Sequence, residues 1–350
     1  MLEAKFKHHT FKFKIPGGTS RGVLTEKKAY FIKVWDQDNP DQFGLGECSY
    51  IPGLSIDNLD EIESCLEKIV INVNAPYEEL LGMADEFPCV RFGLEMAFSS
   101  LKNGNAFKLN HNPFFNKSLP LKTNGLIWMG NKKFMQEQIK TKLELGFSCL
   151  KMKVGAIDFE TELEILAEIR KEFDEHDLTL RVDANGAFSP SDALNKLERL
   201  SELALHSIEQ PIMAGQWSEM AKLCEKTPIP IALDEELIGV KVSEIPQLLD
   251  LIMPQYIILK PSLIGGIEVS KEWIQHAGQR SIPWWITSAL ESNLGLNAIA
   301  QFVSNYYNPL PQGLGTGQLY TENIPSPLNL QGEYLSYDSE GSWDTSIIEF

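Results

Sequence analysis

Three lysines and three carboxylates recur in this chain at nearly constant spacing, at or near the ends of short apolar segments. They are Lys151, Lys153, Asp183, Glu209, Asp234 and Lys260. From Lys153 onward the steps between successive residues are 30, 26, 25 and 26 residues. One strand, one helix and two loops need about that many residues, so the period is typical of a β/α repeat. The carboxyl ends of consecutive parallel strands are where a β/α barrel places its chemistry.

The three carboxylates would come from three consecutive strand ends. Brought together alone, Asp183, Glu209 and Asp234 would repel one another, and one or two would take up protons. A divalent cation removes this conflict, and oxygen ligands completed by water favour Mg²⁺ over zinc, with Mn²⁺ as a substitute. No cysteine or histidine occurs at these strand ends. We therefore predict that the three residues bind Mg²⁺.

The lysines suit proton chemistry beside such a metal ion. Lys151 and Lys153 alternate along one strand and so project to the same side, where an uncompensated buried lysine is penalised. Lys260 would come from the opposite side of the barrel. A lysine on each side of a metal ion suits removal of a proton from the carbon next to a carboxylate. Lys151, the metal ion and burial would favour the neutral form that a base needs, so we predict Lys153 as the base and Lys151 as its electrostatic neighbour.

Each of these residues also has a purely structural interpretation. A single acidic residue at a strand end is more often a helix cap than a metal ligand. Two lysines at alternate positions could equally lie on a surface edge. The agreement of all six positions with one period favours a site over coincidence.

The repeat occupies about the last two thirds of the 350 residues, which predicts a β/α barrel with one appended domain. We place the appended domain at residues 1–118, the barrel at 119–324 and a segment that returns to the appended domain at 325–350. The first of these shows alternating apolar residues and then helical spacing, so we predict an α+β capping domain. Strands are expected over 4–15 and 29–36, a glycine-rich loop at 16–22, and helices over 57–71 and 88–103.

The barrel elements are predicted in the same way. Buried strands are expected over 123–129, 149–154 and 178–183. Ser189 followed by Pro190 marks the start of a helix. Later helices are expected near 216–226, 243–251, 267–277 and 294–304.

Composition and charge limit the partners. The formal net charge of −17 argues against nucleic acid and anionic membrane surfaces, which carry negative charge themselves. The five cysteines form an odd number without Cys-x-x-Cys spacing, which favours a reduced cytoplasmic protein over a disulfide scaffold. We expect neither a signal peptide nor a membrane span. A small-molecule carboxylate is the expected substrate, and the sequence predicts no particular oligomeric state.

Five short motifs, taken as a set, resemble the muconate-lactonizing subgroup of the enolase superfamily. They are Lys151-Met152-Lys153, Asp183-Ala184-Asn185, Glu209-Gln210-Pro211, Asp234-Glu235 and Lys260-Pro261. The resemblance implies an α/β fold, a (β/α)7β TIM-like barrel with an N-terminal α+β capping domain. Within the subgroup, Ser288 to Leu296 and Gly313 to Gly317 are similar to the o-succinylbenzoate synthase family of menaquinone biosynthesis.

That resemblance implies a hydro-lyase that dehydrates 2-succinyl-6-hydroxy-2,4-cyclohexadiene-1-carboxylate through a metal-stabilised enediolate. Mg²⁺ would be held by the three carboxylates. Lys153 would abstract the α-proton and then protonate the departing hydroxyl, while Lys260 would stabilise the enediolate as a cation. Loops of the capping domain at 17–21 and 49–54 would close over the substrate. Substrate contacts would come from Arg21, Asn185, Ser288, Gly315 and Gly317.

Other functions stay open at this point. N-acylamino acid racemases and the cycloisomerases of the same subgroup share the two-lysine arrangement, and in a racemase Lys153 and Lys260 would act on opposite faces of one carbon. Dipeptide epimerases carry an Asp-x-Asp after the last strand, where this chain has Gly315-Thr316-Gly317, so a dipeptide ammonium group would find no partner. A non-catalytic barrel would be expected to lack a ligand or a lysine, and none is missing.

Overall fold

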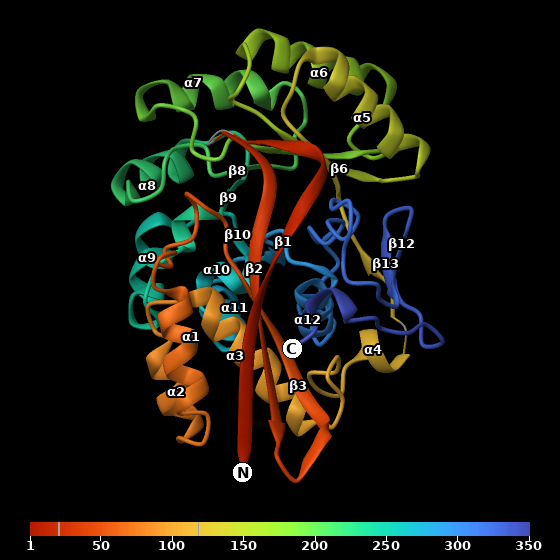
Figure 1. Cartoon of the computed structure of the whole chain (residues 1–350). Helices are drawn as coiled ribbons and strands as arrows, with labels where there is room; N and C mark the ends of the chain where they lie inside the picture. The colour runs from red at the N-terminus through yellow and green to blue at the C-terminus, as the bar shows by residue number, and fades with distance from the viewer. Residues whose placement is uncertain (20–21, 118) are drawn as a thin grey trace.

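The computed structural model describes residues 1–19, 22–117 and 119–350, and it contains a barrel and a smaller α+β unit (Figure 1). The smaller unit has a three-stranded antiparallel sheet in chain order, followed by three helices. The elements are β1 (Leu2–Thr19), β2 (Gly22–Asp36), β3 (Asn39–Ser49), α1 (Ile62–Ile71), α2 (Tyr77–Met83) and α3 (Pro88–Lys102). Helix α3 packs on β3 and β2. The predicted α+β capping domain is confirmed.

Both faces of strand β2 are buried. Alternate residues of the strand point to opposite sides of the sheet, and each side packs against a different core. Ala29 and Phe31 belong to the apolar core that continues into the barrel. Tyr30, Ile32 and Val34 belong to a separate core that includes residues of α1 and α3. The capping sheet therefore forms the layer between its own helices and the barrel.

The first hairpin is longer than predicted, and the expected loop at 16–22 is wrong for most of its length. Pairing continues past an irregularity between Lys12 and Gly17, with Gly17 opposite Leu24. Figure 1 shows β1 and β2 side by side along the front of the molecule. A Cβ on Gly17 would lie 3.1 Å from the ring of Trp128, so the hairpin reaches the barrel.

Seven parallel strands form the barrel sheet in chain order. They are β5 (Gly125–Ile127), β6 (Cys149–Lys153), β7 (Thr179–Asp183), β8 (Ser207–Glu209), β9 (Ile231–Leu233), β10 (Tyr256–Leu259) and β11 (Trp284–Ile286). Gln312 forms a parallel bridge with Thr123, and Gly313 forms one with Thr287, so these two residues close the barrel. The eighth strand is reduced to this pair of bridges, and the predicted (β/α)7β barrel is confirmed.

Helices connect the strands on the outside of the barrel. They are α5 (Lys132–Glu144), α6 (Phe159–Glu172), α7 (Pro190–Ser201), α8 (Trp217–Lys226), α9 (Ile245–Ile252), α11 (Gly266–Gln279) and α12 (Asn293–Val303). Local caps fix where they begin, because the side chains of Asn131 and Asp158 accept backbone N–H groups in the first turns of α5 and α6. The sequence did not predict two short helices, η1 (Glu235–Leu237) after β9 and α10 (Pro261–Ile264) after β10. A third, η2 (Val242–Glu244), overlaps the start of the helix expected near 243–251.

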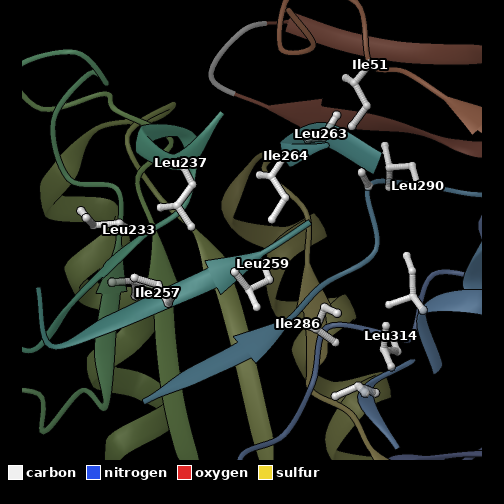
Figure 2. Packing of buried hydrophobic residues seen from close by; sticks show 14 of the residues in the cluster. Ile51, Leu233, Leu237, Ile257, Leu259, Leu263, Ile264, Ile286, Leu290 and Leu314 are labelled. Carbon is white, nitrogen blue, oxygen red and sulfur yellow. The ribbon is translucent and has the colours of Figure 1, made fainter. Parts of the chain in front are cut away.

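The apolar core is continuous between the barrel and the capping sheet. Figure 2 shows Ile51 of the capping domain close to Leu263 and Leu290, at the carboxyl ends of the barrel strands. A smaller cluster, which includes Ala232 and Trp285, is formed by the barrel strands themselves. Fully burying an aliphatic side chain is worth about 1.5–3 kcal/mol, so this shared core favours a fixed arrangement of cap and barrel.

A third, small sheet lies beside the barrel. It pairs β12 (Leu328–Gln331) with β13 (Tyr334–Tyr337), and β13 with β4 (Leu121–Lys122). Helix α4 (Pro113–Lys117) contacts β13. The end of the chain thus packs near the stretch that leads into the first barrel strand.

The last residues also touch the capping domain. The turn η3 (Ser346–Ile348) contacts β1, and Trp343 stacks on Phe107 with ring centroids 4.5 Å apart. The domain boundaries at 118 and 324 stay predictions.

The five cysteines are free and buried. In the described part of the chain, none of the helices combines the length and apolarity that a bilayer crossing requires.

Candidate active site

Strand register places the charged residues at one end of the barrel. Lys153 lies opposite Asp183 in the pairing of β6 with β7, and Asp183 lies opposite Glu209 in the pairing of β7 with β8. Asp234 follows β9 directly, and Lys260 follows β10. All five residues therefore lie at the carboxyl ends of neighbouring strands, where the residue spacing predicts the chemistry.

Two lysines from β6 are bound to carboxylates of the next two strands. Lys151 Nζ lies 2.9 Å from Asp183 Oδ2 and 2.5 Å from Glu209 Oε2. Lys153 Nζ lies 2.9 Å from the same oxygen of Asp183 and donates a hydrogen bond to it. These side chains are all at least nine-tenths buried, so water screens the contacts poorly.

Lys260 forms a separate pair across the barrel, where it donates a hydrogen bond to Asp234 Oδ2. In the sheet order, β10 is four strands away from β6, and the closed ring includes the bridges of Gln312 and Gly313. Lys260 and Lys153 therefore approach from opposite sides of the barrel. Both line the same cavity.

Charge interactions shift the pKa values of the two neighbouring carboxyls in opposite directions. Burial alone would raise the pKa of Asp183, but Lys151, Lys153 and Lys260 outweigh it and hold this pKa well below its usual value. For Glu209, burial and the negative charge of Asp183 raise the pKa well above its usual value. Glu209 is thus the carboxyl of this pair whose charge is less compensated.

Glu209 also has a buried oxygen without a partner. Lys151 contacts Oε2, whereas Oε1 has no hydrogen-bond partner among the described residues. An unsatisfied buried carboxylate oxygen is costly, and a divalent cation would satisfy it. An acidic donor set with oxygen ligands alone therefore fits Mg²⁺ better than a softer metal ion.

The carboxylates of Asp183, Glu209 and Asp234 do not converge on one point. In residues 1–19, 22–117 and 119–350, no group of three His, Cys, Asp or Glu side chains lies together as metal ligands. The reason is that Lys151 lies between Asp183 and Glu209, while Lys260 holds Asp234. Metal binding by these three carboxylates would replace lysine contacts that the structure contains.

The charged groups line a cavity of about 510 Å³, a size suited to a small molecule. Its charged and polar side is formed by Lys151, Lys153, Asp183, Asn185 and Lys260. The capping domain covers the opposite side with Gly22, Val23, Leu24, Ile51, Pro52 and Leu54. The segment at 49–54 thus faces the cavity as expected. From the first hairpin it is residues 22–24 that line the cavity, and these follow the 17–21 segment that was expected to close over a substrate.

The predicted substrate-binding residues fall into three groups. Asn185, Ser288 and Gly315 line the cavity. Gly317 does not belong to the lining, and a Cβ there would lie 2.7 Å from Asn293 Oδ1. Arg21 is outside the described residues.

Asn185 links Lys153, the predicted base, to Asp183, a predicted metal ligand. Its backbone N–H donates to Asp183 Oδ1 at 2.9 Å, and its side-chain oxygen accepts from Lys153 Nζ at 2.7 Å. Its amide group donates to Glu235 Oε1 at 3.0 Å. Asn185 adopts a left-handed φ of 45°, a conformation that asparagine tolerates better than most residues.

The hydroxyl group of Ser288 is already engaged within the protein. It donates to Glu291 Oε2 at 2.6 Å, and it accepts from Thr316 Oγ1 at 2.9 Å and from Leu290 N at 3.0 Å. Ser288 therefore shapes the wall of the cavity, because its one proton is not available to a ligand.

The sequence analysis missed one wall of the cavity. Asn124, Leu126 and Trp128 line it from β5 and its flanks, together with Gln138 of α5. The side chain of Gln138 accepts a hydrogen bond from the backbone N–H of Trp128 at 2.9 Å and donates one to its carbonyl oxygen at 3.0 Å. A paired strand would satisfy the same two backbone groups. The signal that could have found Asn124, Leu126 and Trp128 is their alternation, since every second residue of a barrel strand points inward.

Two amines on opposite sides of a small cavity, each beside carboxylates, can take a proton from a bound molecule and return it. The carboxylates and Lys151 set the local charge, while apolar residues of the capping domain line the other side of the cavity. This arrangement suits carbon acids whose negative charge develops next to the charged side of the cavity.

Comparisons with known proteins agree with this geometry. The family described as "Enolase C-terminal domain-like" matches residues 134–338. An o-succinylbenzoate synthase from Desulfotalea psychrophila (strain LSv54 / DSM 12343) is 47% identical over 365 aligned positions, which cover 95% of this chain and 98% of that protein. The crystal structure of MenC from Desulfotalea psychrophila LSv54 has a TM-score of 0.85 and 44% identity, over 96% of this chain and 99% of that chain. An N-succinylamino acid racemase from Thermus thermophilus is 32% identical over 157 residues, 45% of this chain and 40% of the racemase.

Proposed function

We propose that this chain, which belongs to the enolase superfamily, is an o-succinylbenzoate synthase that acts in menaquinone biosynthesis. The observation that carries the proposal is one cavity lined by Lys153 and Lys260 from opposite sides of the barrel. The substrate would be 2-succinyl-6-hydroxy-2,4-cyclohexadiene-1-carboxylate. Similarity to a synthase of this name along nearly the whole chain supports the choice among carbon acids.

Members of this superfamily generally use Mg²⁺. Here Asp183, Glu209 and Asp234 would hold the ion, with Mn²⁺ as a substitute, and the unpartnered Oε1 of Glu209 supports that assignment. When bound, the ion would supply positive charge that stabilises negative charge developing on the substrate carboxylate.

Lys153 would carry the proton in both directions. Its amine would take the proton from the carbon that bears the carboxylate, and the electron pair of that C–H bond would move toward the carboxylate oxygens. That pair then returns to form the new ring double bond as the C–O bond to the hydroxyl breaks. Lys153 gives the same proton to the departing oxygen, so that water leaves and the ring becomes aromatic. Asn185 and Asp183 both accept hydrogen bonds from Lys153 Nζ and would orient it for this exchange.

Lys260 and Lys151 would act through their charge. Lys260 approaches the cavity from the side opposite to Lys153 and stays cationic, because the pull of Asp234 and Glu209 outweighs the cost of burial and raises the pKa of Lys260. The positive charge of Lys151 partly compensates the negative charges of Asp183 and Glu209. The apolar residues of the cap would cover the ring and keep bulk water away.

A second candidate is racemisation of N-succinylamino acids, favoured by the same pair of lysines. In that reaction Lys153 removes the α-proton from one face, and Lys260 returns a proton to the other. Lys260 would have to be a proton donor, whereas the dehydration needs it only as a cation.

We expect a cytoplasmic enzyme with a small-molecule partner, given the free buried cysteines and the net charge of −17.

The test uses purified protein with Mg²⁺ in D₂O. In one sample the cyclohexadiene carboxylate is added and o-succinylbenzoate is followed by NMR. In a second sample an N-succinylamino acid is added and deuterium at its α-carbon is measured. Fast product formation in the first sample with slow exchange in the second supports the synthase. Fast α-deuteration without dehydration would replace it with the racemase.

A further inference from the structure

Lys27 is a buried cation of the capping sheet that the proposed reaction does not use. On β2 it shares with Phe31 the face that is turned toward the barrel, and its side chain is only 3% exposed. Its ammonium group donates to the carbonyl oxygens of Ala289 at 2.8 Å and Leu290 at 2.6 Å. The third donor goes to Ser49 Oγ of the neighbouring strand β3.

The three acceptors of Lys27 are neutral oxygens. In the described part of the chain no carboxylate lies within ion-pair distance of its Nζ. Burial lowers the pKa of Lys27, and the more distant charges of Glu291 and Glu47 oppose that shift. A buried cation is expensive, and an apolar side chain would fill the same place at lower cost. A lysine at this position therefore points to a specific task.

The task is visible in the conformation of Leu290. This residue has a positive φ of 62°, which residues with a Cβ rarely adopt. Its carbonyl oxygen accepts from Lys27 and also from the hydroxyl of Tyr320 at 2.5 Å. The side of this turn that faces inward lines the cavity, with Ser288, Ala289 and Leu290. The cation thus holds the carbonyls of a strained turn that forms part of the substrate wall.

The same turn is connected to the catalytic side of the barrel. Glu291 accepts from Ser288 Oγ at 2.6 Å and from Ser262 Oγ at 2.5 Å. Ser262 belongs to α10 and lies two residues beyond Lys260. A shift of the turn would therefore reach the segment that follows Lys260.

The capping sheet holds the far end of the turn as well. Glu47 of β3 accepts the backbone N–H groups of Ser292 and Gly295, both at 2.9 Å, where α12 begins. Two neighbouring strands of the cap, β2 and β3, thus insert opposite charges at the two ends of one barrel loop. A carboxylate at a helix N-terminus is favourable, so Glu47 fixes α12 while Lys27 fixes the turn before it.

We propose that Lys27 is a positioning residue through which the capping sheet sets the shape of the 288–290 wall of the substrate cavity. The kinetic part of the proposal rests on the proposed dehydratase function, and the structural part does not. Without the cation, the carbonyls of Ala289 and Leu290 lose their donor and the strained turn relaxes. The fit of the substrate then suffers more than proton transfer, because Lys153 and Lys260 keep their own partners.

The central variant is Lys27→Met, which keeps the length of the side chain and removes its charge. We expect KM for the cyclohexadiene carboxylate to rise about tenfold or more, while kcat changes by less than about threefold. Lys27→Arg retains donors and should recover part of the loss. The matched control is Lys28→Met, since Lys28 lies on the other face of β2, where it pairs with Glu63 at 3.0 Å. This control should leave both constants unchanged.

A second measurement does not depend on any enzymatic activity. Hydrogen–deuterium exchange followed by mass spectrometry should show faster exchange of peptides that cover 288–292 in Lys27→Met, and unchanged exchange in Lys28→Met. Tyr320→Phe removes the other donor to the Leu290 carbonyl, and we expect a smaller change in the same direction. If Lys27→Met does not fold, Tyr320→Phe and Lys27→Arg decide the matter.

The possible results separate the positioning role of Lys27 from the proposed dehydratase function. Unchanged KM with unchanged exchange of 288–292 overturns the positioning role. A loss of kcat in proportion to folded protein, at unchanged KM, also overturns it, because that is the mark of a purely structural residue. If the parent protein does not dehydrate the substrate at all, the proposed function fails, and the exchange result still decides the role of Lys27.

Discussion

Lys153 and Asn185 are joined by a hydrogen bond of 2.7 Å from the lysine Nζ to the asparagine Oδ1. Asn185 reaches this position only because its backbone takes a left-handed turn directly after β7. The same turn brings its N–H to Asp183 Oδ1. One short segment therefore orients both the proposed base and a proposed metal ligand.

Removing this acceptor should slow proton transfer. Asn185→Gly keeps the positive φ without strain, since glycine adopts it freely, and deletes only the side-chain amide. We expect kcat to fall by about tenfold, because Lys153 loses one of the two groups that orient it. Steady-state kinetics measure the effect. An unchanged kcat would show that Asp183 alone orients the lysine.

The proposed base itself should be indispensable. Lys153→Ala should lower turnover by about 10³-fold or more, because it removes the amine proposed to take and return the proton. Binding of Mg²⁺, measured by calorimetry, should be largely retained, since the carboxylates remain. More than a trace of activity in this variant would remove the role of Lys153.

Glu209 should contribute directly to metal affinity. Glu209→Gln keeps the shape of the side chain and removes its charge, so the affinity for Mg²⁺ should fall by about tenfold or more. Glu225→Gln on the exposed face of α8 is the matched control and should bind as the parent does. Equal affinity of the Glu209 variant and this control in calorimetry would refute the ligand assignment.

His206 should make the protein less stable in mild acid. Burial and the charge of Arg181 lower its pKa to about 4, whereas the unfolded chain titrates near 6.5. Between these values the unfolded state binds a proton that the folded state does not, so stability falls as the pH drops below about 6.5. The loss between pH 7 and pH 5 should be about 1–2 kcal/mol.

His206→Phe is the comparison for this effect. It keeps a ring against Tyr256 and Trp285, which lie 5.1 and 6.2 Å from the imidazole between ring centroids. Denaturant unfolding at both pH values gives the free energy of unfolding for each protein. The variant should lose less stability than the parent on acidification, and an equal loss would contradict the account.

The barrel could be predicted because its strands are recognisable in the sequence by composition and spacing. From β6 to β10 each is a short apolar run that ends in, or is followed directly by, a charged residue, and the steps from Lys153 to Lys260 match one strand and one helix. Parallel register then places Lys153, Asp183 and Glu209 side by side. The spacing could not reveal that Lys151 lies between two of the carboxylates, because that depends on where flexible lysine side chains end.

The coupling between cap and barrel could not be predicted. Lys27 and Glu47 look like ordinary polar positions of antiparallel strands, where one face is often solvated. Their partners are the Leu290 carbonyl and the Ser292 backbone, which lie 263 and 245 residues away in the sequence. The extension of the first hairpin escaped prediction for a similar reason, since residues 17–19 pair with residues 22–24 despite their glycine-rich composition.

The most direct test of the whole account is the rate at which purified protein consumes the cyclohexadiene carboxylate, followed by the loss of diene absorbance. It is measured with Mg²⁺, after EDTA, and after Mg²⁺ is added back, in parallel with Lys153→Ala. The account predicts fast turnover that EDTA abolishes and Mg²⁺ restores, and none in the variant. Absence of turnover in the parent protein with Mg²⁺ bound would contradict the proposed dehydration.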